Sequence, residues 1–336
     1  MIISDASLFV LAIVAAAIIS AGLTAAIRPL LLKHALAKPN ARSSHRIPTP
    51  QGAGIAVIAA TLVVAAAVMA DASRVNIPIA VFGATLFIAI VGFADDLKSI
   101  PVVARLLLQA IAVGAIVFAA PDDLRIVSAC PLWIERGLIL LAGLWFVNLV
   151  NFMDGLDWMT VAEVVPVTAA IIALGLFGDL PPPPVIVAAA LCGAMIGFAP
   201  FNRPVAKIFL GDVGSLPIGL LLGWCLLQLA SHQHLAATLL LPLYYLADAS
   251  VTLLRRVVKR EPFWAAHRSH FYQRATDNGF SVWRVVSEVF VLNVVLAGLA
   301  IVSTRTPSLT IEAALVLLGG AAVAFLMHRF SQPRTS

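Results

Sequence analysis

Carboxylate and amide side chains are concentrated in one short segment of this sequence, VNLVNFMDGLDWMT, at residues 147–160. Asn148, Asn151, Asp154 and Asp157 lie within ten residues, at the end of a run of Leu, Trp, Phe and Val. A carboxylate beside such an apolar run is costly unless it pairs with a cation, binds a metal or faces water. Spacings of three residues would place each pair on one side of a helix. We interpret the segment as part of a functional site; the alternative is a polar turn that ends a helix.

A second acidic pair, Asp95 and Asp96, directly follows an apolar run. Adjacent carboxylates repel each other, so the pair favours a site that holds a divalent cation or a proton. Lys98 follows two residues later and is a candidate for binding an anionic substrate. Arg105 and Gln109 are four residues apart on the next predicted helix and therefore share a face. We expect that face to look into the site.

The segment FLGDVGSLPIG, at residues 209–219, precedes another apolar run. Gly211, Gly214 and Ser215 are typical of a turn whose backbone N–H groups bind a phosphate at a helix N-terminus. Asp212 would repel a bare phosphate, and a Mg²⁺ ion between the two would remove this conflict. The same pattern also makes a good helix-starting turn, so alone it is only moderately specific.

Two further segments supply cations. KPNARSSHRIPTPQGAG, which begins at residue 38, contains prolines and glycines that exclude a continuous helix. Its Arg42 and His45 could hold a phosphate or diphosphate, and an ordinary basic cytoplasmic loop is an equal alternative. Asp248 lies nearly two helical turns before Arg255, too far for direct pairing along a helix. The segment HRSHFYQR then brings together His267, Arg268, His270 and Arg274.

The rest of the sequence must position these groups in a membrane. Hydrophobic residues make up 61% of the 336 residues and charged residues 12%, and the mean hydropathy is +1.00. These values exclude an ordinary soluble domain. Eleven apolar runs of about spanning length lie near residues 8–27, 52–70, 78–94, 103–120, 136–150, 160–177, 184–200, 214–230, 236–254, 285–303 and 309–327. We predict an all-α polytopic transmembrane bundle of about eleven helices, formed by one domain at 1–330, with a flexible tail at 331–336.

The charge distribution predicts the orientation of this bundle. When the loops are assigned to alternating sides, 18 of the 22 Lys and Arg residues fall on one side. The positive-inside rule makes that side cytoplasmic, with a periplasmic N-terminus and a cytoplasmic C-terminus. Basic residues placed in loops favour lipid headgroups or an anionic substrate as partners, and not nucleic acid. Every acidic motif above falls on the same side, so we expect one active site built from cytoplasmic loops.

Five motifs, in matching order, resemble those of the polyprenyl-phosphate N-acetylhexosamine-1-phosphate transferases, glycosyltransferase family 4. RSSHRIPTPQGAGIA is similar to the family's first loop, GFADDLKSI to its Asp-Asp motif and NLVNFMDGLDWM to its Asn-x-x-Asn-x-x-Asp-Gly-x-Asp-Gly motif. FLGDVGSLPIG resembles the Gly-Asp-x-Gly-Ser motif, and Asp248 before two arginines resembles the Pro…Asp…Arg-Arg helix. The family includes the phospho-MurNAc-pentapeptide translocase and the enzymes that initiate O-antigen, enterobacterial common antigen and teichoic-acid linkage units.

Three features depart from the family pattern. Trp158 stands where the second glycine is usual, and Ala53 interrupts the usual glycine run. HRSHFYQR replaces the His-x-His-His pattern of many members and the histidine triplet of the peptidoglycan enzyme. The resemblance is therefore closer to the branch that starts O-antigen-type lipopolysaccharide chains, some of whose members use N-acetylfucosamine or N-acetylquinovosamine.

The resemblance implies transfer of N-acetylhexosamine-1-phosphate from a UDP-sugar to undecaprenyl phosphate, with release of UMP, at the bacterial inner membrane (EC 2.7.8.-). It implies Mg²⁺ as cofactor, with Mn²⁺ as an alternative, held by Asp212 and Asp154. The residues with implied catalytic roles are Asp95, Asp96, Asp154, Asp157, His267 and His270. The residues with implied substrate-binding roles are Arg42, His45, Lys98, Asn148, Asn151, Gly211, Gly214, Ser215, Asp248, Arg268 and Arg274.

Two other classes of membrane protein carry similar residues but fit this sequence less well. An ion- or proton-coupled transporter would also place Asp, Asn and His in a multi-span bundle, but near mid-membrane and often in two related halves. A CDP-alcohol phosphatidyltransferase carries Asp-Gly motifs within one continuous segment, followed by an Ala-Arg that this sequence lacks. The sequence leaves open a homodimer as the assembly.

Overall fold

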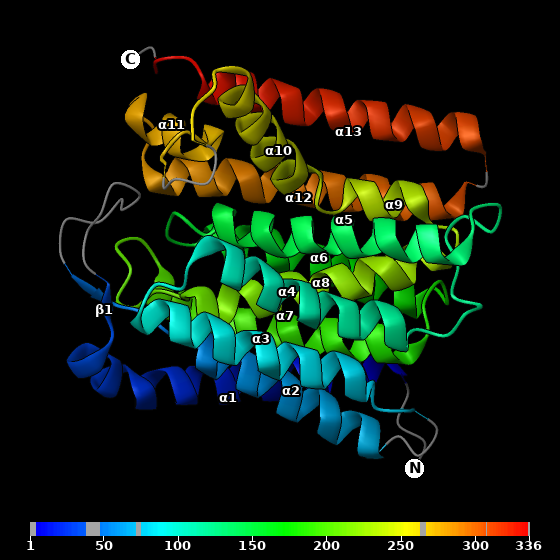
Figure 1. Ribbon diagram of the computed structural model, residues 1–336, viewed down its shortest axis with the longest axis horizontal. Helices are drawn as coiled ribbons and strands as arrows, with labels where there is room; N and C mark the ends of the chain where they lie inside the picture. Colours follow the sequence, from blue (N-terminus) through cyan, green and yellow to red (C-terminus); the bar gives the residue numbers. More distant parts are fainter. Residues whose placement is uncertain (1–4, 38–47, 72–74, 263–266, 307, 335–336) are drawn as a thin grey trace.

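The computed structural model describes residues 5–37, 48–71, 75–262, 267–306 and 308–334. Within these residues the chain forms a helical bundle with one two-stranded antiparallel sheet (Figure 1). The elements are α1 (Asp5–His34), β1 (Leu36–Ala37), β2 (Thr49–Pro50), α2 (Gly54–Asp71), α3 (Ile79–Leu97), α4 (Val102–Ala119), α5 (Leu132–Met153), α6 (Met159–Leu176), α7 (Pro182–Asn202), α8 (Asp212–Ser231), α9 (Leu235–Leu240), α10 (Leu243–Val258), α11 (Phe271–Asp277), α12 (Val282–Arg305) and α13 (Leu309–Phe330).

Ten helices of the described residues are long and apolar enough to cross a membrane. Helices α7 and α8 lie at the centre of the bundle and are mostly buried, whereas α1, α4 and α13 keep large apolar side chains on their outer faces. Such outward apolar side chains are unfavourable in water and are what a lipid-facing surface requires. The structure therefore confirms the predicted polytopic helical bundle.

The predicted run at 236–254 does not form one helix. Helix α9 ends at Leu240 and α10 begins at Leu243, with Pro242 between them. Proline has no N–H group and its ring clashes with the preceding turn, which favours a break at this position. Pro166 and Pro217, by contrast, lie inside continuous helices. In Figure 1, α10 leaves the direction that the neighbouring helices share. The predicted count of about eleven spans is thus corrected to ten continuous candidates and one broken pair.

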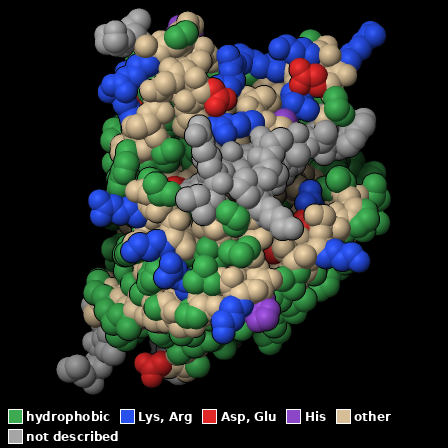
Figure 2. Space-filling view, turned by 90° about the vertical axis from the view of Figure 1, so that its left-hand side faces the viewer, with side chains coloured by type: hydrophobic (Ala, Val, Ile, Leu, Met, Phe, Trp, Pro, Cys, Tyr) green, Lys and Arg blue, Asp and Glu red, His purple; other side chains and the backbone are tan. Residues whose placement is uncertain are grey.

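The loops predicted to be cytoplasmic gather at one end of the bundle. Helix α1 begins at the opposite end and α13 finishes at this one, as Figure 1 shows. We call this end the loop end; it contains β1, β2, α11 and the segments 98–101, 154–158, 203–211 and 259–262. Figure 2 faces it and shows Lys and Arg side chains spread around it. The exposed ones include Lys33, Arg203, Lys207, Arg255 and Lys259. That this end is cytoplasmic remains a prediction from charge.

Close glycine contacts bring three segments of the loop end together. A Cβ atom on Gly54 of α2 would lie 2.3 Å from the Cα of Gly214 in α8. A Cβ atom on Gly92 of α3 would lie 2.3 Å from the carbonyl oxygen of Asp212. Any side chain at these glycines would push the helices apart. The first turn of α2 and the last turns of α3 can therefore lie directly against the beginning of α8.

Candidate active site

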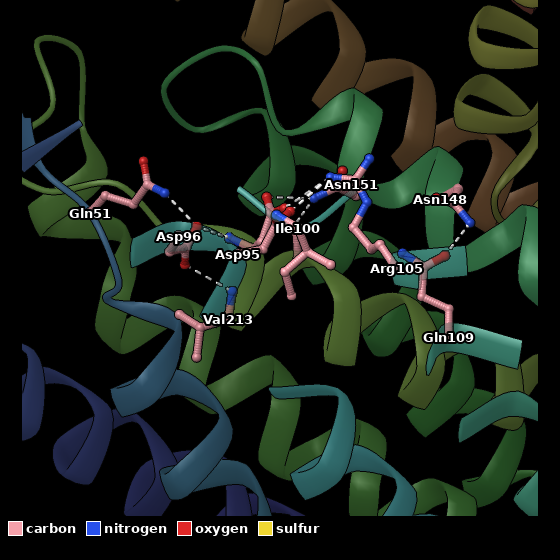
Figure 3. Close-up of polar contacts among 11 residues, drawn as sticks. Gln51, Asp95, Asp96, Ile100, Arg105, Gln109, Asn148, Asn151 and Val213 are labelled. Carbon is pink, nitrogen blue, oxygen red and sulfur yellow. Dashed lines mark hydrogen bonds and ion pairs between the residues drawn. The ribbon is translucent and has the colours of Figure 1, made fainter. Parts of the chain in front are cut away.

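Asp96, near the end of α3, caps the beginning of α8. The backbone N–H of Asp212 donates to Asp96 Oδ1 at 2.9 Å, and that of Val213 donates to Oδ2 at 3.1 Å (Figure 3). The side-chain amide of Gln51 donates to the same carboxylate. Gly211, with φ +79°, adopts a left-handed conformation, and a Cβ there would lie 2.5 Å from Asp96 Oδ2. The anion at this helix N-terminus is thus a carboxylate of the protein itself.

The glycine turn before α8 also satisfies its remaining N–H groups internally. The N–H groups of Gly214 and Ser215 donate to the carbonyl of Gly211, at 3.0 and 2.9 Å. Together with the cap by Asp96, these bonds leave the first turn of α8 without free N–H groups for a phosphate. The turn therefore corresponds to the helix-starting alternative that the sequence left open.

Asp95 lies beside Asp212, and the two share the guanidinium of Arg105. Arg105 Nη1 is 2.7 Å from Asp95 Oδ2 and 3.9 Å from Asp212 Oδ2. Asp95 also accepts the backbone N–H of Ile100 at 2.5 Å. Arg105 therefore lies beside both aspartates. A cation between two carboxylates partly neutralises their mutual repulsion.

Asn151 joins the predicted Asn-Asp segment to α8. Its Nδ2 donates to Asp212 Oδ1 at 2.7 Å and to Ser215 Oγ at 2.9 Å. The side chain of Asp212 is 27% exposed, and its second oxygen has the distant contact with Arg105. Asp96 and Asp95 each accept two or more short hydrogen bonds, so Asp212 has the greatest remaining capacity to accept a ligand.

The second half of the segment forms a tight turn between α5 and α6. The hydroxyl of Thr160 donates to Asp154, and the backbone N–H of Ala206 donates to Asp157 Oδ2 at 3.0 Å. Asp157 is buried, so it serves to attach the 203–211 loop to this turn. Asp154 is partly exposed. Burial, and next the neighbouring carboxylates of Asp96 and Asp157, raise the pKa of Asp154 to about 7, against the effect of the Thr160 bond.

Asn148 lies deeper in the bundle than these groups. Its Nδ2 donates to Gln109 Oε1 at 2.6 Å and to the carbonyl of Leu144 at 2.8 Å. Figure 3 shows this pair separated from Asp95 and Asp96, with Arg105 between. Gln109 and Arg105 point from one face of α4, as their spacing predicted, but only Arg105 reaches the aspartates.

Asp248 is fully buried in α10 and holds α11 in place. Its carboxylate accepts the backbone N–H groups of Phe271 and Tyr272, at 3.0 and 3.1 Å, and contacts His270 Nδ1 at 3.1 Å. The hydroxyl of Tyr244 donates to it as well, at 3.1 Å. These contacts surround the carboxylate. Asp248 therefore anchors the segment 267–274, which we call the histidine loop, and does not face a substrate.

The histidine loop stacks its rings and reaches the Asp154 turn. His267 stacks on His270 with 5.0 Å between ring centroids, and His270 stacks on Tyr272 at 5.7 Å. The hydroxyl of Tyr272 donates to the carbonyl of Phe152, at the end of α5, at 2.9 Å. A Cβ on Gly155 would lie 2.2 Å from that hydroxyl, so only glycine fits there. The structure thus brings together two segments that the sequence could only assign to the same side.

The remaining predicted residues lie around this cluster. Arg268 pairs with Asp277 at 3.2 Å, Arg274 lies over the ring of Phe271, and Lys98 is exposed at the end of α3. The predicted Arg42 and His45 lie outside the described residues. Sequence reasoning assigned no site role to Gln51, Thr160 and Tyr272. Their partners lie in other segments or across a tight turn, so no helical spacing signals them.

Residues 78–230, from the start of α3 almost to the end of α8, match the family model of glycosyl transferase family 4. Over this segment, which is a little under half of its length, the chain is similar to glycosyl transferase family 4. The phospho-N-acetylmuramoyl-pentapeptide-transferase of Enterococcus faecalis is 30% identical over 55% of this chain and 57% of the relative. The decaprenyl-phosphate N-acetylglucosaminephosphotransferase of Mycolicibacterium smegmatis is 30% identical over 62% of this chain and 57% of the relative. The chain thus spans little more than half the length of these curated relatives.

The aspartates of this site could supply oxygen ligands of the kind that Mg²⁺ takes. No group of three or more His, Cys, Asp or Glu side chains converges as a metal cage in the described part of the chain. Mg²⁺ does not require such a cage, because it is usually held by one or two carboxylates, waters and substrate phosphates. Asp212 has the spare carboxylate oxygen for that role, and Asp154 interacts with the same acidic cluster through Asp96.

Proposed function

We propose that this multi-pass protein transfers N-acetylhexosamine-1-phosphate from a UDP-sugar to undecaprenyl phosphate in the bacterial inner membrane. UMP leaves, and the lipid-linked diphosphosugar begins an O-antigen-like polysaccharide. The observation that carries the proposal is the carboxylate of Asp212, which faces Asp95 across Arg105 at the loop end of an apolar bundle. Such a place can admit a lipid phosphate from the bilayer and a nucleotide diphosphate from water.

The chemistry required is phosphoryl transfer, in which positioning and charge neutralisation supply most of the catalysis. Mg²⁺, held by Asp212 and Asp154, would neutralise charge on the diphosphate of the donor. Arg105 is placed beside both Asp95 and Asp212 and would orient the lipid phosphate for in-line attack. That phosphate is largely ionised at neutral pH, so no strong general base is required.

The other predicted groups divide into positioning and binding roles. Asp96, Asp157 and Asp248 are used to cap helices or attach loops, so we assign them positioning roles. His267 and Arg274 lie in the histidine loop, which Tyr272 holds against the Asp154 turn. We propose that this loop contacts the sugar and the diphosphate of the donor.

The test is release of labelled UMP by the purified full-length protein with undecaprenyl phosphate and Mg²⁺. UDP-GlcNAc, UDP-N-acetylfucosamine and UDP-N-acetylquinovosamine would be compared as donors. We expect turnover with one of them, and a loss of about 100-fold or more in Asp212→Asn, as is typical when a group that stabilises transition-state charge is removed.

The matched control is Asp122→Asn, which changes an exposed aspartate that pairs with Arg136 at 2.7 Å in the loop between α4 and α5. This variant should keep full activity. If folded protein binds the lipid but turns over none of the three donors, the proposed reaction is wrong.

A further inference from the structure

A second acidic group lies inside the bundle, in the second turn of α6. Glu163 in α6 is 2% exposed, and its Oε2 accepts a hydrogen bond from Asn293 Nδ2 of α12 at 2.7 Å. No Lys, Arg or His of the described residues forms an ion pair with it. A buried ionised carboxylate without a cation is strongly unfavourable, so either a proton or a bound cation must neutralise it.

Three buried oxygen atoms at this place have no hydrogen-bond partner among the described residues. They are Oε1 of Glu163, Oδ1 of Asn293 and the hydroxyl oxygen of Tyr245. They come from three helices, α6, α12 and α10, and Asn293 and Tyr245 are 1% and 0% exposed. The Tyr245 phenol interacts electrostatically with the Glu163 carboxylate, and also with Asp154 and the Thr160 side chain. Buried polar atoms normally find partners, so unpartnered oxygens on neighbouring side chains point to a bound species.

The orientation of the Asn293 amide is fixed by its other contacts. Its Nδ2 donates both to Glu163 Oε2 and to the backbone carbonyl of Ala162, at 2.7 and 2.9 Å. Both of these partners are acceptors, so the nitrogen must lie on their side and Oδ1 must point elsewhere. The amide therefore presents an oxygen, and not an N–H group, on its side away from Ala162.

We propose that Glu163, Asn293 and Tyr245 form a binding site for one small monovalent cation such as Na⁺. The carboxylate supplies the compensating charge, and the amide and phenol supply two neutral oxygen ligands of the kind that hard cations prefer. The ion would hold α6, α10 and α12 together. Helix α6 begins directly after the Asp154 turn and α10 carries Asp248, so the ion would also stabilise the framework of the loop end.

The experiment is thermal unfolding of the purified full-length protein in a neutral detergent, without substrate. NaCl, LiCl and KCl would be compared with N-methyl-D-glucamine chloride at equal ionic strength. A ligand that binds only the folded state raises the midpoint temperature of unfolding. We therefore expect this temperature to rise by roughly 4 °C, and to saturate, as Na⁺ is added. Glu163→Gln, which keeps the size of the side chain, should abolish the rise.

Two further variants make the test decisive. Glu288→Gln removes a carboxylate of α12 that pairs with Arg284 and Arg329, and it should keep the Na⁺ response. Tyr245→Phe removes one neutral ligand and should raise the half-saturating Na⁺ concentration; it remains informative if Glu163→Gln does not fold. Equal midpoints in Na⁺ and N-methyl-D-glucamine for the unmodified protein would overturn the proposal. Because no substrate is present, that result would leave the proposed transferase reaction untouched.

Discussion

Replacing Asp96 with alanine should destabilise the protein through the beginning of α8, and not only through lost chemistry. In the structure, the carboxylate of Asp96 accepts the N–H groups of Asp212 and Val213, at 2.9 and 3.1 Å. These are two of the donors that a helix leaves unsatisfied at its N-terminus. Alanine offers them no acceptor, and the half-buried position limits the access of water.

The size of the effect follows from these contacts. A hydrogen bond to a charged group contributes about 1.5–3 kcal/mol, and loss of an N-terminal cap costs about 0.5–2 kcal/mol. We therefore expect Asp96→Ala to lower the free energy of unfolding by about 3 kcal/mol. Asp96→Asn keeps one acceptor oxygen, so it should lose about half of that. In both variants Asp212 shifts with the first turn of α8, and activity should fall as well.

The assay is unfolding of the purified protein in mixed micelles of dodecyl maltoside and increasing sodium dodecyl sulfate. Asp71→Ala is the matched control, because Asp71 is an exposed aspartate at the end of α2. It should change the unfolding free energy by less than about 0.5 kcal/mol. If Asp96→Ala were as stable as this control but inactive, the capping argument would be refuted and Asp96 would act on substrate.

Two other predictions concern the turn after α5. Gly155→Ala should lower the free energy of unfolding by about 2 kcal/mol, because the added Cβ would lie 2.2 Å from the Tyr272 hydroxyl. Adding Tyr272→Phe removes that hydroxyl and should restore part of the lost stability. A double variant no more stable than Gly155→Ala would show that this clash is not the cause. For Asp154, a pKa of about 7 in the folded chain against an ordinary 3.8 means that the folded state holds the extra proton. Without Mg²⁺, the unfolding free energy should therefore fall between about pH 4 and pH 7, by at most about 1.4 kcal/mol per pH unit, and Asp154→Asn should flatten this dependence; parallel curves for the two proteins would show that Asp154 is not the titrating group.

Local periodicity and charge predicted the spans, the segregation of basic loops and the shared face of Arg105 and Gln109. These features depend on a few neighbouring residues, which a sequence displays directly. The cap that Asp96 provides to α8 joins residues far apart in the chain, and nothing in the pair Asp95–Asp96 distinguishes the capping member from its neighbour. The same holds for Asp248, whose partners in α11 follow a long loop. Sequence reasoning therefore found the aspartates of the site. It could not tell which of them stabilise the fold and which are available to bind a ligand.

Trp158 illustrates how a departure from the family pattern can be accommodated. Its backbone has φ +64° and ψ 0°, the left-handed conformation in which glycine is favoured and a bulky residue is strained. The tryptophan compensates with contacts that glycine lacks: its indole N–H donates to the carbonyl of Ala199 at 2.6 Å, and its ring packs edge-on against Trp283 at 5.0 Å. Its backbone N–H, which glycine would also have, donates to Asn202 Oδ1 at 2.8 Å. The turn therefore demands a backbone conformation and not a residue type, and the tryptophan uses the same position to join α6, α7 and α12 beside the acidic cluster.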